Sequence, residues 1–172
     1  MHALIIGHPG VGKSTLIQNV ICALSCPVGG YFTKKEDALA DGLLGSPVYL
    51  YDASQPRRQT PENLVGFVRD RHPKAHPEAF DRLASVILSP VPRGGIVVMD
   101  EIGTMESKSG DFCQAIRTRL EGDTPVLAAV KEKDTPFLLE VRSHPNCRCF
   151  YITPENRDAL LSEITDFLRE QL

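Results

Sequence analysis

The sequence predicts an α/β protein in which a mostly parallel central sheet carries helices on both faces. Short apolar runs typical of buried strands alternate along the chain with amphipathic runs typical of helices. A glycine-rich segment follows the first of these strands, and a later strand ends in two adjacent carboxylates. With 172 residues, the chain has room for one such domain and is too short for two ordinary ones. We therefore expect a single domain over residues 1–172.

Strands are expected where apolar runs stand between turn residues. They cover residues 2–7, 95–101, 126–130 and 148–153, with a short antiparallel pair at 31–33 and 48–51. Helices are expected where apolar residues recur at helical spacing. Three of them cover residues 13–24, 111–120 and 137–141, and three others begin at 60–62, 76–78 and 153–155. The helix that begins at 60–62 is expected to carry the apolar residues Leu64, Phe67 and Val68.

Residues 7–14 read Gly-His-Pro-Gly-Val-Gly-Lys-Ser and fit G-x-x-x-x-G-K-[ST], the pattern of the phosphate-binding P-loop. Glycines allow the backbone amides to turn toward phosphate oxygens, and the N-terminus of the following helix favours an anion. Lys13 can reach the β- and γ-phosphates, and the Ser14 hydroxyl can occupy one coordination site of Mg²⁺. The predicted nucleotide-binding residues of this segment are Gly7, His8, Pro9, Gly10, Val11, Gly12, Lys13, Ser14 and Thr15.

The alternative for this segment is a glycine-rich turn that only joins a strand to a helix. Such a turn has no need for a lysine followed by a serine, so the P-loop is the favoured interpretation.

Asp100 and Glu101 end the apolar strand predicted at 95–101. Four apolar residues followed by an aspartate have the form of a Walker B strand, whose carboxylate holds Mg²⁺ directly or through water. We expect Asp100 to support the metal together with Ser14. Glu101 is then placed to orient or deprotonate a water molecule, which makes Glu101 and Lys13 the candidate catalytic residues. The alternative is that the two carboxylates only cap a turn.

Residues 100–103 also fit the D-x-x-G pattern of GTPase switch regions. Residues 131–134 read Lys-Glu-Lys-Asp and approach the guanine-reading N-K-x-D motif, but Glu132 stands where the lysine is needed. A guanine-specific switch is therefore disfavoured. A glutamate directly after the aspartate favours instead the RecA-like branch of the three-layer P-loop NTPase fold. That branch has a catalytic glutamate and one extra strand between the P-loop strand and the Walker B strand.

Four segments in order resemble the cancer-related nucleoside-triphosphatase family. They read Gly-His-Pro-Gly-Val-Gly-Lys-Ser-Thr-Leu at 7–16, Gly-Tyr-Phe-Thr at 30–33, Val-Met-Asp-Glu-Ile-Gly-Thr-Met-Glu at 98–106 and Thr-Pro-Glu-Asn-Arg-Asp at 153–158. The resemblance implies a RecA-like fold and Mg²⁺-dependent hydrolysis of ATP, GTP and other nucleoside triphosphates to the diphosphate, with loose base selectivity. Two regions depart from the family pattern. Thr104 replaces a usual lysine, and residues 34–36 and 41–45 lack the usual arginines.

Asn156 and Arg157 follow the last predicted strand and are candidates to contact the base or the ribose. The alternative is that they satisfy the exposed amides at the start of a helix. A transition-state arginine is also expected in this chemistry, and the sequence does not choose among its candidates. These candidates are Arg57, Arg58, Arg93, Arg142 and Arg148.

The composition of the chain indicates which classes of binding partner to expect. Nineteen basic and 22 acidic residues leave no basic field for nucleic acid or a membrane surface, so nucleoside triphosphates are the expected partners. The apolar stretch at 3–6 is too short for a signal peptide, and a cytoplasmic location with five reduced cysteines is expected. Two other functions stay open. One is a kinase that passes the γ-phosphate to an acceptor, and the other is a binding module timed by slow turnover.

Overall fold

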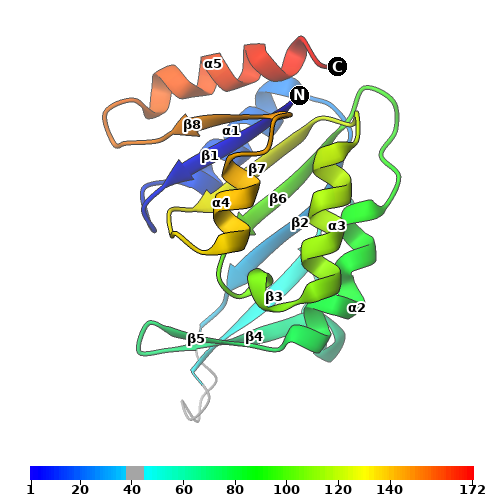
Figure 1. The fold of residues 1–172 in the computed structure, drawn as a ribbon, viewed down its shortest axis with the longest axis vertical. Coiled ribbons are helices and arrows are strands. Elements are labelled where there is room, and N and C mark those ends of the chain that lie inside the picture. The colour runs from blue at the N-terminus through cyan, green and yellow to red at the C-terminus, as the bar shows by residue number, and fades with distance from the viewer. Residues whose placement is uncertain (38–44) are drawn as a thin grey trace.

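The computed structural model describes residues 1–37 and 45–172 as an eight-stranded sheet between two layers of helices (Figure 1). The strands are β1 His2–Gly7, β2 Val28–Lys35, β3 Ser46–Asp52, β4 Leu64–Arg69, β5 His72–Ala75, β6 Ile96–Ile102, β7 Val126–Lys131 and β8 Cys147–Tyr151. The helices are α1 Lys13–Leu24, α2 Pro77–Leu88, α3 Gly110–Glu121, α4 Pro136–Arg142 and α5 Arg157–Arg169. None of the helices in these described ranges is long and apolar enough to cross a membrane.

The order of the strands confirms the predicted fold class. Across the sheet it is β5-β4-β3-β2-β6-β7-β1-β8. The strands β2, β6, β7, β1 and β8 run parallel, and β3, β4 and β5 extend one side as antiparallel neighbours. β7 lies between β1 and β6, as expected of the branch with a catalytic glutamate. The carboxyl ends of the parallel strands therefore meet at one edge of the sheet, and this edge carries the candidate site.

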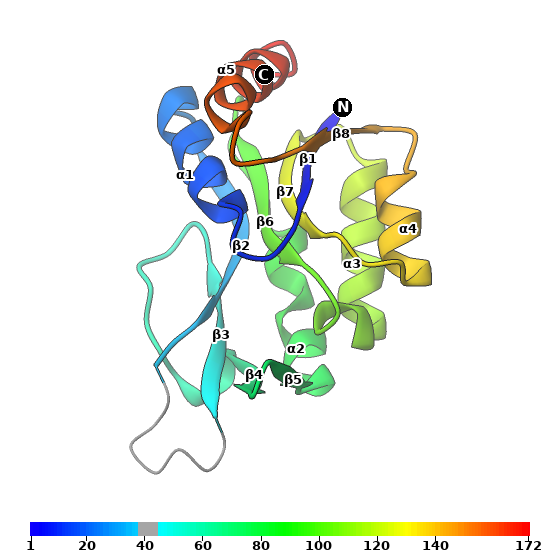
Figure 2. The same ribbon diagram turned by 90° about the vertical axis from the view of Figure 1, so that its left-hand side faces the viewer.

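Two apolar cores separate the sheet from its helices. Helices α1 and α5 cover one face, and α2, α3 and α4 cover the other (Figure 2). Every residue of β1 is buried, as expected of a central parallel strand that is covered on both sides. Between β2, α2 and α3, the rings of Tyr31 and Phe80 each meet the ring of Phe112 edge to face, with centroids 5.1 Å apart. This packing anchors the central strands that end at the candidate site.

The prediction of a helix that begins at 60–62 is wrong. Only Pro61–Asn63 is helical, as a single 3₁₀ turn, and the next residues form β4. The Asn63 side chain closes this turn by accepting the Thr60 amide and donating to the backbone carbonyl oxygen of Leu50. The following residues then pair with β3 instead of coiling. Strand pairing overrides the helical spacing of the apolar residues there.

The predicted strand pair at 31–33 and 48–51 is confirmed, because β2 and β3 pair antiparallel over Tyr31–Lys35. Strand β5 was not predicted. It is four residues long, mostly exposed and contains Pro73, so it carries no apolar signal. The last helix begins at Arg157, later than the expected start at 153–155. Residues 38–44 lie outside the described part of the chain, and with them most of the altered segment at 41–45.

Candidate active site

The loop between β1 and α1 carries Lys13 into a buried position beside Glu101. Its ammonium group donates hydrogen bonds to the backbone carbonyl oxygens of Gly7, at 2.8 Å, and His8, at 3.2 Å. Lys13 Nζ also lies 3.5 Å from Glu101 Oε2, and the lysine side chain is only 4% exposed. The backbone at Gly10 and Gly12 has φ values of 81° and 107°, which favour glycine. The loop and Glu101 together line a cavity of about 260 Å³, here called the phosphate cavity.

Ser14 and Asp100 meet on one side of the phosphate cavity. The Ser14 hydroxyl donates to Asp100 Oδ1 over 3.0 Å. Burial raises the pKa of Asp100 to about 6, which shows that its negative charge lacks full compensation in this environment. A hydroxyl and a buried carboxylate are hard oxygen ligands that suit Mg²⁺. The two residues therefore fit a magnesium ion that would also bind phosphate oxygens.

Glu101 stands between two lysines at the end of β6. Besides Lys13, it faces Lys131, whose Nζ lies 4.0 Å from Glu101 Oε1. The pairing of β6 with β7 shifts between Asp100 and Ile102, so Glu101 lies outside the regular ladder. Such an irregularity re-aims a side chain. It accounts for how two successive carboxylates reach the same site, although successive residues of a regular strand face opposite sides.

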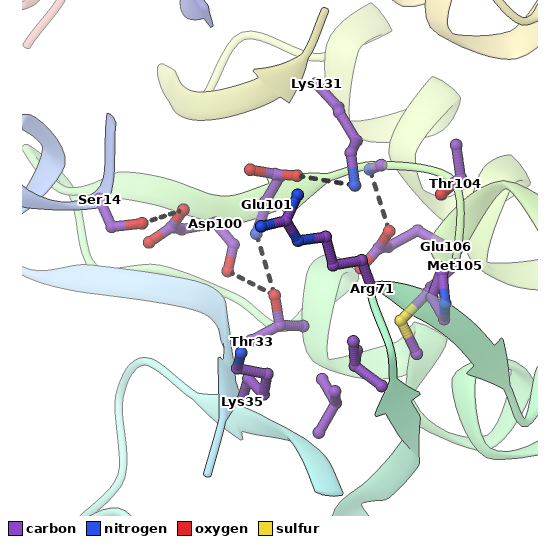
Figure 3. Close-up of a pocket in the computed structure, with 14 residues that line it drawn as sticks. Ser14, Thr33, Lys35, Arg71, Asp100, Glu101, Thr104, Met105, Glu106 and Lys131 are labelled. Carbon is purple, nitrogen blue, oxygen red and sulfur yellow. Dashed lines mark hydrogen bonds and ion pairs between the residues drawn. The ribbon is translucent and has the colours of Figure 1, made fainter. Parts of the chain in front are cut away.

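Thr33 of β2 fixes the backbone between the two carboxylates (Figure 3). Its hydroxyl accepts a hydrogen bond from the Glu101 amide at 3.2 Å and donates one to the Asp100 carbonyl oxygen at 3.1 Å. Tyr31, on the same strand, donates its hydroxyl hydrogen bond to the Glu101 carbonyl oxygen at 3.3 Å. β2 therefore sets the position of both acidic residues from the neighbouring strand.

Glu106 closes the turn that follows β6. It is 6% exposed, and its Oε2 accepts the Gly103 amide at 3.0 Å. Burial is the main reason that the pKa of Glu106 is raised to about 7, and the charge of Glu101 contributes to this rise. Thr104 lies in the same turn. Both side chains face a second cavity of about 260 Å³, here called the lateral cavity, which opens on the side of Glu101 that faces β3–β5.

The structure brings one of the five candidate arginines to the site. The Arg57 guanidinium lies over the rings of Phe32 and Tyr51, with its central carbon 5.1 Å and 5.9 Å from their centroids. Arg57 lines a cavity of about 370 Å³ together with Ser14 and Asp100. Its positive charge favours the ionised form of Asp100 and so acts to lower the pKa of that carboxyl.

The other four arginines lie elsewhere. Arg142 pairs with Asp134 and Arg148 pairs with Glu163, both with nitrogen-to-oxygen distances of 2.5 Å. Arg58 lines a different cavity, beside α2, and Arg93 is exposed in the loop that precedes β6. None of these four lines a cavity with Ser14 or Asp100.

Asn156 and Arg157 have different surroundings. The Asn156 side chain accepts the Thr153 amide at 2.8 Å and donates to the Tyr151 carbonyl oxygen at 2.9 Å, so it holds the turn between β8 and α5. Arg157 lies against the P-loop, because a side chain at Gly12 would meet its Cδ and Nη1 at 3.3 Å. With Thr15, it lines a cavity of about 190 Å³ between α1 and α5. Only Arg157 of this pair has its side chain directed at the loop.

The sequence reasoning missed three cationic residues and one hydroxyl at the site. Lys131 and Thr33 lie near the carboxyl ends of β7 and β2, so applying the same edge-of-sheet argument to every parallel strand would have found them. Lys35 and Arg71 line the lateral cavity. Arg71 carried no signal, because it lies between β4 and β5, which the sequence did not predict.

Known proteins resemble this chain over nearly its whole length. A family model described as NTPase matches residues 2–165. The chain is 32% identical to a nucleoside-triphosphatase THEP1 of Pyrococcus abyssi, over all of the chain and 94% of that protein. It is also 32% identical to a cancer-related nucleoside-triphosphatase homologue of Mus musculus, over 95% of the chain and 94% of that protein.

Two solved structures share the fold. The crystal structure of THEP1 from Aquifex aeolicus matches with a TM-score of 0.75 and 23% identity, over 98% of this chain and 99% of that one. The solution structure of a human cancer-related nucleoside triphosphatase matches with a TM-score of 0.68 and 28% identity, over 98% of this chain and 97% of that one. With the family match over nearly the whole chain, these findings show that the chain belongs to the NTPase family of P-loop proteins.

Proposed function

We propose that the protein hydrolyses nucleoside triphosphates, ATP and GTP among them, to the diphosphate and phosphate, with Mg²⁺ as the metal cofactor. The observation that carries this proposal is the approach of Lys13 to Glu101 at 3.5 Å, in the same cavity as Ser14. A phosphate-binding cation, a candidate general base and a metal-binding hydroxyl then surround one small space. The full-length relatives named as nucleoside-triphosphatases support the same activity.

Each residue has a separate task in this mechanism. The loop amides and Lys13 bind the phosphate oxygens, and Ser14 and Asp100 would hold the metal. When bound there, the cation would supply positive charge against the phosphate groups. Glu101 accepts the proton of a water molecule that attacks the γ-phosphorus. Its backbone is kept in place by the hydrogen bond that its amide donates to Thr33 and by the one that its carbonyl oxygen accepts from Tyr31.

Product analysis tests the proposal directly. Purified protein is incubated with each nucleoside triphosphate, with Mg²⁺ or with chelator, and the products are separated by anion exchange. We expect equal amounts of diphosphate and inorganic phosphate, formed only with the metal present. If the wild type releases no more phosphate than a Lys13→Ala control, the proposal is contradicted.

We expect poor discrimination between ATP and GTP. The strand end at residues 131–134 carries Glu132 where a guanine-reading motif needs lysine. The cavity beside Thr15 and Arg157 also has two leucines, Leu16 and Leu161, whose apolar surface suits any base. Competition titrations should give affinities within about tenfold of each other, roughly 1.4 kcal/mol. A much larger preference would show that a base-reading contact exists in the nucleotide-bound protein.

Arg57→Ala is expected to lower the rate of hydrolysis about 10- to 100-fold and to change ground-state nucleotide affinity little. Arg57 lines a cavity together with Ser14 and Asp100, and its guanidinium lies over the rings of Phe32 and Tyr51. A positive charge there acts most strongly on the charge that develops during transfer. Single-turnover experiments measure the rate of hydrolysis. Titrations with Mg²⁺·ADP measure the affinity, without aluminium fluoride and with it as part of the transition-state analogue.

Arg58→Ala is the matched control, because Arg58 has the same charge and lines a cavity away from Ser14 and Asp100. It should leave both the rate and the affinity for the transition-state analogue unchanged. Equal effects of the two substitutions would assign the loss to general surface charge and remove Arg57 from the mechanism.

A further inference from the structure

The lateral cavity is larger than hydrolysis requires. It has a volume of about 260 Å³ and opens directly beside Glu101. One water molecule needs on the order of 15 Å³ of cavity volume, and hydrolysis uses a single attacking water. The cavity therefore has room for a small organic molecule next to the candidate general base.

The lateral cavity shares Ser14 and Glu101 with the phosphate cavity, and its other walls come mostly from neighbouring parts of the sheet. β2 contributes Lys35, the β4–β5 turn contributes Arg71, and β7 ends in Lys131 (Figure 3). Val48 and Val68 form an apolar side. Apolar side chains with a few charged groups beside them are the usual lining of a small-ligand site.

This cavity is lined by the cations Lys35, Arg71 and Lys131, together with the carboxylates Asp100, Glu101 and Glu106. An anion is therefore favoured at Lys35 and Arg71 and not over the whole cavity. Lys131 lies near Glu101, as described above. Within residues 1–37 and 45–172, no carboxylate lies within ion-pair distance of Lys35 or Arg71. The planar guanidinium of an arginine and the ammonium group of a lysine together match the oxygens of a phosphate group.

We propose that the lateral cavity binds a small molecule that carries both a phosphate group and a hydroxyl group. Lys35 and Arg71 hold the phosphate group, and the hydroxyl group takes the place of the attacking water beside Glu101. This inference rests on the proposed function, because the phosphate cavity supplies the nucleoside triphosphate. It makes the protein a phosphotransferase as well as a hydrolase, with hydrolysis as the reaction when the lateral cavity holds only water.

The transfer step balances with the groups already described. The acceptor oxygen forms a bond to the γ-phosphorus, and the bond from that phosphorus to the β,γ-bridging oxygen breaks. Glu101 takes the hydroxyl proton, and the nucleoside diphosphate leaves with the electron pair of the broken bond. The products are the diphosphate and a second phosphate ester of the acceptor. No oxidant or reductant is involved.

The first test measures binding with inorganic phosphate as the probe. The protein is saturated with Mg²⁺ and the β,γ-imido analogue of ATP, so that the γ-phosphate position is filled, and phosphate is titrated by calorimetry. We expect binding by the wild type and at least tenfold weaker binding by Arg71→Ala and Lys35→Ala. Lys74→Ala is the matched control, since this exposed lysine lies on β5 and outside the lining of the cavity.

The second test follows the label of [γ-³²P]ATP with glycerol 3-phosphate, ribose 5-phosphate or glucose 6-phosphate as the acceptor. We expect a labelled bisphosphate with at least one of them, reduced at least tenfold in Arg71→Ala and retained in Lys74→Ala. Thermal unfolding of each variant confirms that it is folded.

Three outcomes would overturn the acceptor site. They are no phosphate binding by the wild type, equal losses in Arg71→Ala and Lys74→Ala, and label confined to ATP and inorganic phosphate with all three acceptors. If ATP is still hydrolysed without any acceptor in those cases, the hydrolase stands and only the acceptor site fails. If the wild type neither hydrolyses ATP nor transfers its phosphate, the proposed function itself fails.

Discussion

Glu101→Gln protein is expected to bind Mg²⁺ and nucleoside triphosphate almost as the wild type does and to hydrolyse the nucleotide about 10²- to 10⁴-fold more slowly. The amide keeps the size of the side chain but cannot accept the proton of the attacking water. The Nζ atoms of Lys13 and Lys131 lie 3.5 and 4.0 Å from the Glu101 carboxylate oxygens, so both lysines lose an ionic partner in this variant. We expect the γ-phosphate to take the place of that partner when the nucleotide binds. Single-turnover rates and equilibrium titration of the same preparation separate the two effects.

Asp100→Asn is the comparison for this experiment. Asp100 lies against Ser14, and its buried charge is the one that a magnesium ion would compensate. Its removal should therefore weaken Mg²⁺-dependent nucleotide binding as well as turnover. Near-normal hydrolysis by Glu101→Gln would exclude Glu101 as the base and leave the γ-phosphate itself as the proton acceptor.

Lys13→Ala is expected to weaken nucleoside triphosphate binding at least about a hundredfold, roughly 2.8 kcal/mol. Lys13 is the cation that the P-loop holds inside the phosphate cavity, through the carbonyl oxygens of Gly7 and His8. Its loss removes the charge that faces the β- and γ-phosphates. Calorimetric titration with a non-hydrolysable analogue measures the affinity directly.

The control for this substitution must show that the variant is folded, because Lys13 is buried. Circular dichroism and the thermal unfolding midpoint provide it, and Lys133→Ala, in the loop after β7, is a matched lysine variant outside the phosphate cavity. A folded Lys13→Ala protein with unchanged affinity would remove the P-loop assignment.

The parallel part of the sheet was predictable because its signals are local. A buried parallel strand is apolar on both faces, and both β1 and β6 show this in sequence. Glu101 indicated the branch of the fold and so predicted one extra strand between them, and the structure shows that this strand is β7. The P-loop and the Asp100–Glu101 pair were likewise visible as contiguous motifs.

The antiparallel side of the sheet was not predictable in the same way. The apolar residues at 64, 67 and 68 have helical spacing, and only pairing with β3 makes them a strand. β5 is short, polar and exposed, so its position depends on β4 rather than on its own composition. The positions of Arg71 and of the wall of the lateral cavity depend on β4 and β5. The sequence could not place them, because it did not predict these two strands. Arg57 illustrates the same limit, because its support by Phe32 and Tyr51 joins three separate segments.

The position of β1 within the sheet has a consequence for how the protein is made. Both ladder partners of this strand come from late in the chain, since Ala3 pairs with Leu127 on one side and with Arg148 on the other. Contacts between segments so far apart in sequence form slowly, because a long loop must close before they contribute any stability.

During synthesis, β1 and the P-loop leave the ribosome before β7 and β8 and must wait for them. At roughly 5–20 residues per second, this wait lasts several seconds or more. The apolar β1 has both of its edges unpaired throughout this time, which exposes it to aggregation or to chaperones. The P-loop follows β1 directly, so we expect nucleotide to bind once β1 has its partners in the sheet. A nucleotide that binds only the folded state stabilises the completed protein and does not guide its early folding.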